Sequence, residues 1–384
     1  MFPHRGVNPY PPARKQRRSR EANGRPGGGF SLVEIMVGMA ISLISVLIVL
    51  QVFKDFEGQK RTTTSGSDAQ TSGAVAIYTV ERDTRMAGYG FSIPDALGCK
   101  INRSFDGEIS ELSLAPVTVT NGAGGLPDAI RILSSSKGSW SIPARITTDH
   151  PPEATNFFLN TTLGMAEGDL LIAYEAGKDC TLLQVTGIPS GNIQVHHQNT
   201  SPWNPPGGQN IFPSGGYNVG ATLFNLGALT DHAYSLDASS NLLFSDYNSA
   251  TNASNVQPII PDIVQLQAQY GFDTRLGAQT DARIDTWSDT LIDADGNGST
   301  TDGSDIKRIY AVRLAIVARS ALKEKANSSG TCVTTTSSNA PTWSGGAIDV
   351  SRNPSGTANA DWQCYRYKTF ETVIPLRNLI WRQS

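Results

Sequence analysis

The chain has 384 residues and a formal net charge of −3, and 39% of its residues are hydrophobic. The first 29 residues carry seven Lys or Arg residues and one acidic residue, so the net charge of the remainder is −9. This acidic balance argues against a general basic surface, and no direct nucleic-acid binding is expected. The 37 Gly and 21 Pro residues favour a turn-rich region made mostly of β-strands.

An apolar run from Phe30 to Phe53 follows the basic segment, and Glu34 is its only charged residue. A helix over this run would be about 36 Å long, enough to cross a hydrocarbon core of about 30 Å. We therefore predict one transmembrane helix over residues 30–53. By the positive-inside rule, the basic residues keep the N-terminus in the cytoplasm and everything after Phe53 lies across the membrane.

Three glycines stand before this helix, so a cut at the glycines would leave the helix on the mature chain. The stretch GGGFSLVEIMVGMA resembles the processing site of type IV prepilins. The resemblance implies that a prepilin peptidase cuts between Gly29 and Phe30 and methylates Phe30, and that Glu34 is the fifth residue of the mature chain. Residues 1–29 are then a leader, which we expect to be unstructured and lost on processing.

The charge of Glu34 inside the apolar run can also be explained physically, without the resemblance. An ionisable side chain inside a membrane span costs about 2.5 to 3.5 kcal/mol, so it is usually paired or functional. The nearest candidate partner is the free amine of Phe30, either in the same chain or in a neighbouring helix at an axial offset. The resemblance favours the pairing between chains, as an assembly contact. The alternative is that Glu34 only reaches to the headgroups.

Residues 54–90 are predicted to continue the helix as a stalk. Their threonines and glycines lower helix propensity, so we expect the helix to soften from Thr62 to Gly73 and to recover from Ala74. Ala87-Gly88 is the expected C-cap. The ending ERDTRMAGYGF resembles the end of the long N-terminal helix of PilW-like minor pilins.

From Glu111 onward, short apolar runs alternate with turn residues, which is typical of β-strands. The predicted strands are Leu112–Val119, Ala129–Leu133, Asp169–Tyr174, Thr181–Thr186, Asn192–His196, Ile263–Phe272, Ile309–Ala318 and Tyr365–Pro375. The alternation in Ile263–Phe272 indicates a half-buried strand.

The stretch Thr200–Asn218 is a predicted long loop with three aromatic residues, Trp203, Phe212 and Tyr217. One hypothesis makes it a partner-contacting loop. The favoured alternative is a loop held down by its own aromatic side chains.

The closing segments DIVQLQAQYGFDT, VRLAIVARS and YRYKTFETVIPLRNLIW resemble the final half of PilW-type minor pilins, whereas residues 99–261 carry no recognised motif. The implied fold is α+β and pilin-like, with a long N-terminal transmembrane and stalk helix. Residues 91–384 form a large, mostly antiparallel β-rich head in this prediction.

Four cysteines, Cys99, Cys180, Cys332 and Cys364, all follow the membrane span, on the side where disulfides persist. Three pairings are compatible with the sequence. We favour Cys99 with Cys180 and Cys332 with Cys364, because this order joins segments within each half of the head. Metal binding is the weaker alternative, since no two cysteines have close spacing.

One stretch, IDADGNGSTTDGSD, is a candidate calcium site. Asp293, Asp295 and Asn297 match the first three ligand positions of a D-x-D-x-N-G loop. The twelfth position, which needs a bidentate Glu, is Ser304, and Asp302 and Asp305 lie off register. The alternative is an acidic turn between two strands. No other cofactor is indicated.

No enzyme motif is present: the sequence lacks GxSxG, Walker, HExxH, CxxC and GxGxxG patterns, so we predict a non-catalytic protein. His196 and His197 are adjacent and on a strand would face opposite sides. His150, His196, His197 and His232 are predicted to be ordinary surface or partly buried residues.

The resemblance implies a minor pilin that takes part in starting or assembling a type IV pilus, and so indirectly in adhesion, twitching motility or DNA uptake. Its partners would be other minor and major pilins, the prepilin peptidase and the inner membrane. It would be a single-pass inner-membrane protein with a periplasmic head, and reach the pilus or cell surface after assembly. The alternatives are a type II secretion pseudopilin and a membrane-anchored adhesin or binding module.

Overall fold

The computed structural model describes residues 29–137, 142–191, 193–208, 210–276, 280–300 and 302–380. The predicted leader therefore lies outside the described residues except for Gly29, and so does Asn192 at the start of a predicted strand. The chain divides into two compact units, one ending at Glu57 and one beginning at Gly58.

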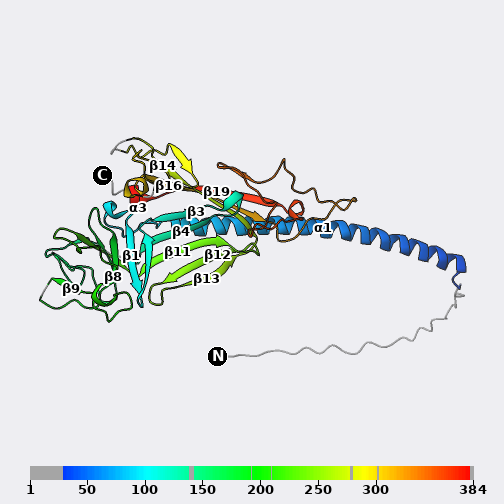
Figure 1. The fold of residues 1–384 in the computed structure, drawn as a ribbon. Coiled ribbons are helices and arrows are strands. Elements are labelled where there is room, and N and C mark those ends of the chain that lie inside the picture. Colours follow the sequence, from blue (N-terminus) through cyan, green and yellow to red (C-terminus); the bar gives the residue numbers. More distant parts are fainter. Residues whose placement is uncertain are drawn as a thin grey trace, which may run out of the picture. The chain divides into compact units, whose positions relative to one another are not determined.

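Helix α1 runs without a break from Leu32 to Thr84 (Figure 1). The predicted softening between Thr62 and Gly73 is wrong at the level of secondary structure, because packing outweighs weak helix propensity here. The side chain of Ala69 is buried, and a Cβ on Gly73 would overlap the ring of Phe370. The helix ends three residues before the predicted cap.

The end of α1 is followed by a turn that connects it to a strand. Gly88, in the predicted cap, has a φ of +71°. Its N–H donates to the Leu133 carbonyl at 2.9 Å, so it forms a link to the sheet rather than a helix cap.

One face of α1 is buried in the head and the opposite face is exposed. The buried side chains include Ala69, Ala76 and Val80, whereas Val75 and Tyr78 point to solvent. Small buried residues let the helix approach the neighbouring strands closely. The buried face of this segment of α1 is therefore formed by its small residues.

A five-stranded antiparallel sheet has the order β13-β12-β11-β4-β3. Its strands are β3 (Val117–Thr120), β4 (Ala129–Ser135), β11 (Leu229–Leu236), β12 (Leu242–Asn248) and β13 (Ala253–Ile260). The predicted strand Leu112–Val119 is wrong as a single strand, because it is interrupted before β3 by a segment that contains Pro116. Proline has no N–H to donate to a strand ladder, which accounts for the interruption.

A four-stranded antiparallel sheet has the order β15-β14-β16-β19. Figure 1 labels β14, β16 and β19. Its strands are β14 (Ile263–Phe272), β15 (Thr286–Ser288), β16 (Ile309–Arg319) and β19 (Tyr367–Pro375), with the short helices α2 (Gly303–Ile306) and α3 (Arg377–Ile380) nearby in the chain. The three long strands confirm the prediction. However, β14 is buried on both faces rather than half-buried.

The second face of β14 is covered by the chain after β16. Ile348 and Val350 form a small core with Val264 and Val317. The polar side chain of Gln265 is buried and donates to the carbonyls of Gly125 and Asp349, so its amide remains hydrogen-bonded.

The remaining sheet has six strands in the order β2-β1-β8-β7-β10-β5, and only the β1–β8 pair is parallel. Its strands are β1 (Lys100–Phe105), β2 (Glu108–Ser113), β5 (Ala144–Arg145), β7 (Leu170–Tyr174), β8 (Cys180–Gln184) and β10 (Thr222–Gly227).

Two-stranded ribbons are formed by β6 (Asn156–Phe158) with β9 (Gln194–His196), and by β17 (Thr342–Trp343) with β18 (Gly346–Ala347). Four 3₁₀ turns are η1 (Pro94–Ala96), η2 (Ala123–Gly125), η3 (Pro206–Gly208) and η4 (Trp362–Cys364). The fold is α+β, with a large, mostly antiparallel head.

Candidate functional site

The N-terminal end of α1 holds the residues with predicted roles in processing and assembly. Gly29 and Phe30 immediately precede the helix, and the Phe30 side chain is 81% exposed. Glu34 lies exposed in the first helical turn, where its Oε2 accepts from the Ser31 N–H at 3.4 Å. The N-terminus of a helix is the positive end of the helix dipole and stabilises a nearby carboxylate. Glu34 lies there, beside backbone donors at the start of the helix.

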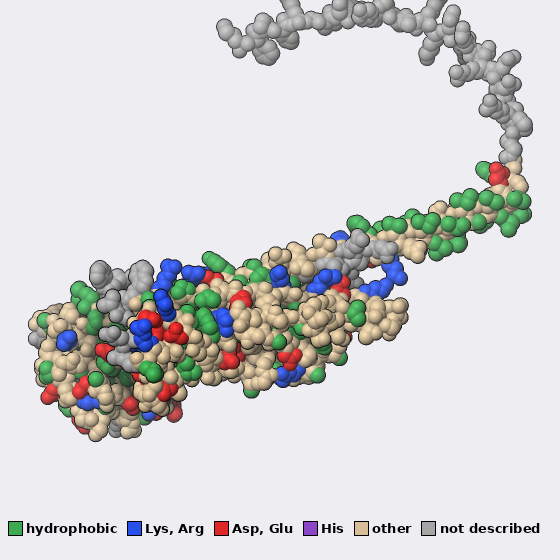
Figure 2. Space-filling model, turned by 90° about the horizontal axis from the view of Figure 1, so that it is seen from above, with side chains coloured by type: hydrophobic (Ala, Val, Ile, Leu, Met, Phe, Trp, Pro, Cys, Tyr) green, Lys and Arg blue, Asp and Glu red, His purple; other side chains and the backbone are tan. Residues whose placement is uncertain are grey.

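Residues Leu32–Lys54 of α1 are long and apolar enough to cross a membrane, and none of this span is buried. Figure 2 shows apolar side chains covering the visible surface of this part of the helix. An exposed apolar surface of this length on a soluble helix would be costly in water. The span is therefore a candidate membrane anchor.

The last turn of α1 is joined to β11 by a carboxylate that the sequence analysis missed. Oδ2 of Asp83 accepts from the Tyr234 hydroxyl at 2.6 Å and lies 2.9 Å from Nδ1 of His232. The hydrogen bond to Asp83 raises the pKa of His232. Burial opposes ionisation of Asp83, but the bonds from His232 and Tyr234 lower its pKa overall. His232 is partly buried, as predicted.

Two disulfides join Cys99 to Cys180 and Cys332 to Cys364. Both predicted pairings are confirmed. The first connects the residue just before β1 to the first residue of β8, and the second connects a loop to η4, before β19. Each closes a long loop of the chain and so restricts the unfolded state.

The aspartate-rich loop between β15 and β16 brings together two of the three predicted ligands and a different third one. The three residues Asp293, Asp295 and Asp305 can each direct one carboxylate oxygen to within 4.8 Å of the others. Asn297 instead accepts from the Ser299 N–H with its amide oxygen. Asp305, the third member of this group, directly follows Ser304 at the twelfth position of the motif.

Asp305 is fully buried, and its Oδ1 accepts from the Ala294 N–H at 2.6 Å. Its Oδ2 is also buried and has no hydrogen-bond partner among the described residues. Burial, together with the neighbouring carboxylates of Asp302 and Asp295, raises the pKa of Asp305 to about 6. An unpartnered buried carboxylate oxygen costs free energy unless a proton or a cation compensates it.

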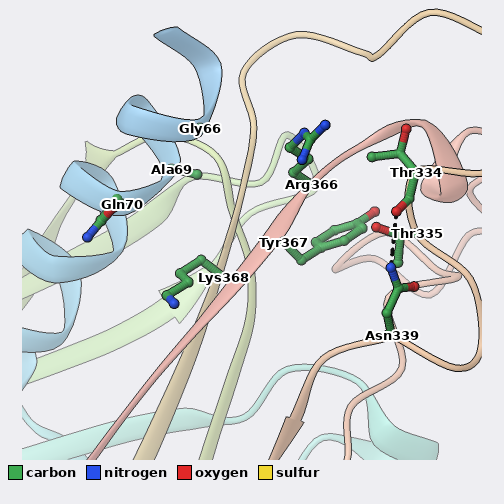
Figure 3. A pocket seen from close by; sticks show the side chains of 9 residues that line it. All are labelled: Gly66, Ala69, Gln70, Thr334, Thr335, Asn339, Arg366, Tyr367 and Lys368. Carbon is green, nitrogen blue, oxygen red and sulfur yellow. Dashed lines mark hydrogen bonds between the residues drawn. The ribbon is translucent and has the colours of Figure 1, made fainter. Parts of the chain in front are cut away.

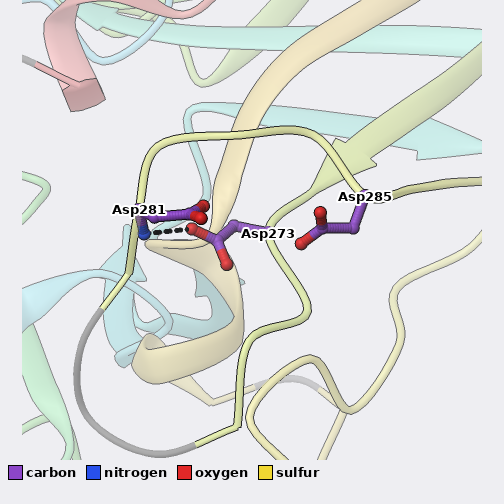
Figure 4. A group of neighbouring side chains, drawn as sticks. All are labelled: Asp273, Asp281 and Asp285. Atoms are coloured by element: carbon purple, nitrogen blue, oxygen red, sulfur yellow. Dashed lines mark hydrogen bonds between the residues drawn. The ribbon is translucent and has the colours of Figure 1, made fainter.

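A second acidic group consists of Asp273, Asp281 and Asp285 (Figure 4). Asp273 is buried, and its Oδ2 accepts from the N–H groups of Asp281 and Ala282. Asp281 forms an ion pair with Arg275 at 3.2 Å. This group therefore already has donors for its carboxylates.

His150 and His197, which are distant in the sequence, are both buried and lie in contact, whereas they were predicted to be surface or partly buried residues. Nε2 of His150 lies 2.9 Å from Nε2 of His197, and the His150 ring stacks on Phe157 with a centroid distance of 3.7 Å. Burial lowers the pKa of His150 to about 4 and that of His197 to about 3. Both imidazoles are therefore neutral near pH 7. Their contact depends on the pairing of β6 with β9, which the sequence does not show.

The loop Thr200–Asn218 is held by its own aromatic side chains, as the favoured alternative predicted. Trp203 and Tyr217 are buried, and Phe212 is nearly so. The Trp203 indole N–H donates to the Ser249 carbonyl, and the Tyr217 hydroxyl donates to the Asp179 carbonyl. These residues do not offer an exposed aromatic surface to a partner.

A hollow of about 300 Å³ lies between α1 and the segments around β19 (Figure 3). It is lined by Gly66, Ala69, Gln70, Thr334, Thr335, Asn339, Arg366, Tyr367 and Lys368. The Asn339 amide donates to the Thr334 carbonyl across one side of it. None of the predicted site residues lines this hollow.

Residues 230–378 match the family model for type IV pilus-assembly protein W. The match begins in β11 and ends in α3, so it includes the whole four-stranded sheet. It starts well before Pro261, in a region where the sequence analysis recognised no motif. No curated protein matches the chain.

Proposed function

We propose that this chain is a PilW-like minor pilin of a type IV pilus, which is processed between Gly29 and Phe30 and takes part in pilus assembly. The observation that carries this proposal is the register of Gly29, Phe30 and Glu34 at the start of an exposed apolar helix. The family match over residues 230–378 supports the same pathway from the other end of the chain. The role is structural, with other pilins as partners.

In this function, the span Leu32–Lys54 first holds the chain in the inner membrane with its head in the periplasm and then packs among other pilin helices. Cleavage frees an amine on Phe30, one helical turn from the Glu34 carboxylate. Pairing between the Glu34 carboxylate of one chain and the amine of a neighbour lets two opposite charges compensate each other in an apolar environment. It also fixes the axial offset of the two helices.

Glu34→Ala tests the proposal in cells that assemble the filament. We expect the variant to reach the membrane at the wild-type level but to be depleted about tenfold or more from sheared surface filaments, because one buried charge loses its partner. Glu57→Ala is the matched control, since Glu57 is an exposed acid of α1 outside the candidate span. It should enter filaments normally.

Normal incorporation of Glu34→Ala would contradict the proposal and favour a helix that serves only to anchor an adhesin or binding module. Co-purification of the wild-type chain with secretion-system pseudopilins, rather than pilins, would favour the pseudopilin alternative.

A further inference from the structure

The loop between β15 and β16 holds three carboxylates whose arrangement fits a hard cation. The ligand oxygens of Asp293, Asp295 and Asp305 lie within 4.8 Å of one another. Two oxygens bound to one Ca²⁺ lie at most about 5 Å apart, since each Ca–O distance is about 2.3 to 2.6 Å. All three carboxylates can therefore reach the same ion.

A second observation points to a ligand at this loop. Oδ2 of the fully buried Asp305 has no hydrogen-bond partner among the described residues, although Oδ1 of the same carboxylate accepts from Ala294. Asp305 lies against Asp293 and Asp295, which are only partly buried. A cation between them would give the unpartnered oxygen a ligand role and would be open to solvent on the other side, where water can complete its coordination.

The other acidic group serves as a comparison within the same chain. In Asp273, Asp281 and Asp285 the buried carboxylate is that of Asp273, and both of its oxygens accept backbone N–H bonds. The Arg275 guanidinium also forms an ion pair with the Asp281 carboxylate. Three carboxylates alone therefore do not distinguish the two groups, whereas the unpartnered oxygen of Asp305 does.

We propose that Asp293, Asp295 and Asp305 bind one calcium ion. The ion would stabilise the contact between this loop and the segment after α1. Lys307 forms an ion pair with Asp95 at 2.6 Å, and a Cβ on Gly303 would overlap the carbonyl of Leu97. The cation site thus ties the family-matched part of the chain to the residues just before the Cys99–Cys180 disulfide.

Calorimetry with Ca²⁺ alone on the full chain in detergent tests this site. We expect one saturable site with a Kd of about 10⁻⁴ to 10⁻³ M, the range of extracellular calcium modules, and Mg²⁺ binding that is weaker by about tenfold or more. No saturable heat at concentrations up to about 10 mM Ca²⁺, well above that range, would overturn the proposal. Equal binding of Mg²⁺ would overturn the assignment to calcium.

Two ligand variants and one control locate the ion. Asp305→Asn and Asp295→Asn should each weaken Ca²⁺ binding about tenfold or more, since each removes one charged ligand. Asp281→Asn, in the comparison group, should bind as the wild type does. Unchanged binding in Asp295→Asn, or loss of binding in Asp281→Asn, would contradict the site.

Thermal unfolding separates a ligand role from a purely structural one. Calcium should raise the melting temperature of the wild type and of Asp281→Asn, because an ion that binds only the folded chain stabilises it. Asp305→Asn should melt no lower than the wild type in a chelator, since its amide removes an unpartnered buried charge, but should not respond to calcium. A calcium response retained in both ligand variants would overturn the proposal.

Discussion

The single side chain of Asp83 links the last turn of α1 to β11. Its carboxylate is only 12% exposed and accepts from both His232 and Tyr234 of β11. Arg82 adds an ion pair at 3.3 Å, and Asp246 lies 3.5 Å from the other nitrogen of His232. The imidazole of His232 therefore lies mainly among carboxylates, and the hydrogen bond to Asp83 together with these charges raises its pKa.

Asp83→Asn should lower the free energy of unfolding by about 1.5 to 3 kcal/mol near pH 5.5, because a hydrogen-bonded charge is lost. The lowered pKa of Asp83 makes its contribution complete above about 3.8 and lost as the pH falls through the folded value. The raised pKa of His232 makes its contribution complete below about 6.5 and lost as the pH rises through the folded value. Urea unfolding of the wild type and the variant should therefore differ more at pH 5.5 than at pH 8.5.

Asp246→Asn is the control, because its carboxylate is 56% exposed and only borders the same imidazole. It should change the unfolding free energy by less than about 1 kcal/mol. A larger difference between wild type and Asp83→Asn at pH 8.5 than at pH 5.5 would contradict the assigned protonation states.

The roles of Gly29, Phe30 and Glu34 come from a short local motif and stay predictions. The two disulfides are confirmed, because they pair the cysteines in their order along the chain. Asp305 lies one position beyond the calcium motif and reaches Asp293 only because the loop closes. The pairing of His150 with His197 likewise depends on folding.

At the scale of elements, α1 is attached to the four-stranded sheet through its smallest residues. Gly73 lies under the ring of Phe370 in β19, with no room for a Cβ. Gly66 lies on the same helix and has nothing within 4 Å of the Cβ position. The two glycines therefore have the same helix propensity but different surroundings.

Gly66→Ala should stabilise the chain by up to about 1 kcal/mol through helix propensity. The same change at Gly73 should destabilise it by about 1 to 3 kcal/mol, because the added methyl group overlaps Phe370. Urea unfolding of the two variants in detergent measures the difference. A Gly73→Ala variant as stable as Gly66→Ala would show that Phe370 yields freely and that this contact does not set the helix position.

Strands with a clear apolar pattern were predictable. Strand β16 is an almost continuous apolar run, whereas apolar and polar residues are interspersed in β14 and β19, and all three strands were found at or near their bounds. Strand β13 was missed, since most of its side chains are exposed and it contains Pro258. The unbroken helix through Thr62–Gly73 also departs from local propensity, because burial of Ala69 and Gly73 against the head supplies the missing stability.

At the scale of the whole molecule, two independent features lead to the same pathway. One is the motif at Gly29–Glu34 with the apolar span after it, and the other is the family match over residues 230–378. The fold class was predictable from these ends of the chain. The six-stranded sheet between them was largely not, because its strands are short and one pair is parallel between distant segments.

The most direct test is the mass and N-terminal sequence of the membrane-extracted protein from cells with and without the prepilin peptidase. We expect a chain that begins with N-methylated Phe30 when the peptidase is present, and an intact leader when it is absent. An intact leader in both strains, or cleavage at another position, would contradict entry into the pilin pathway and reduce the helix to an ordinary membrane anchor.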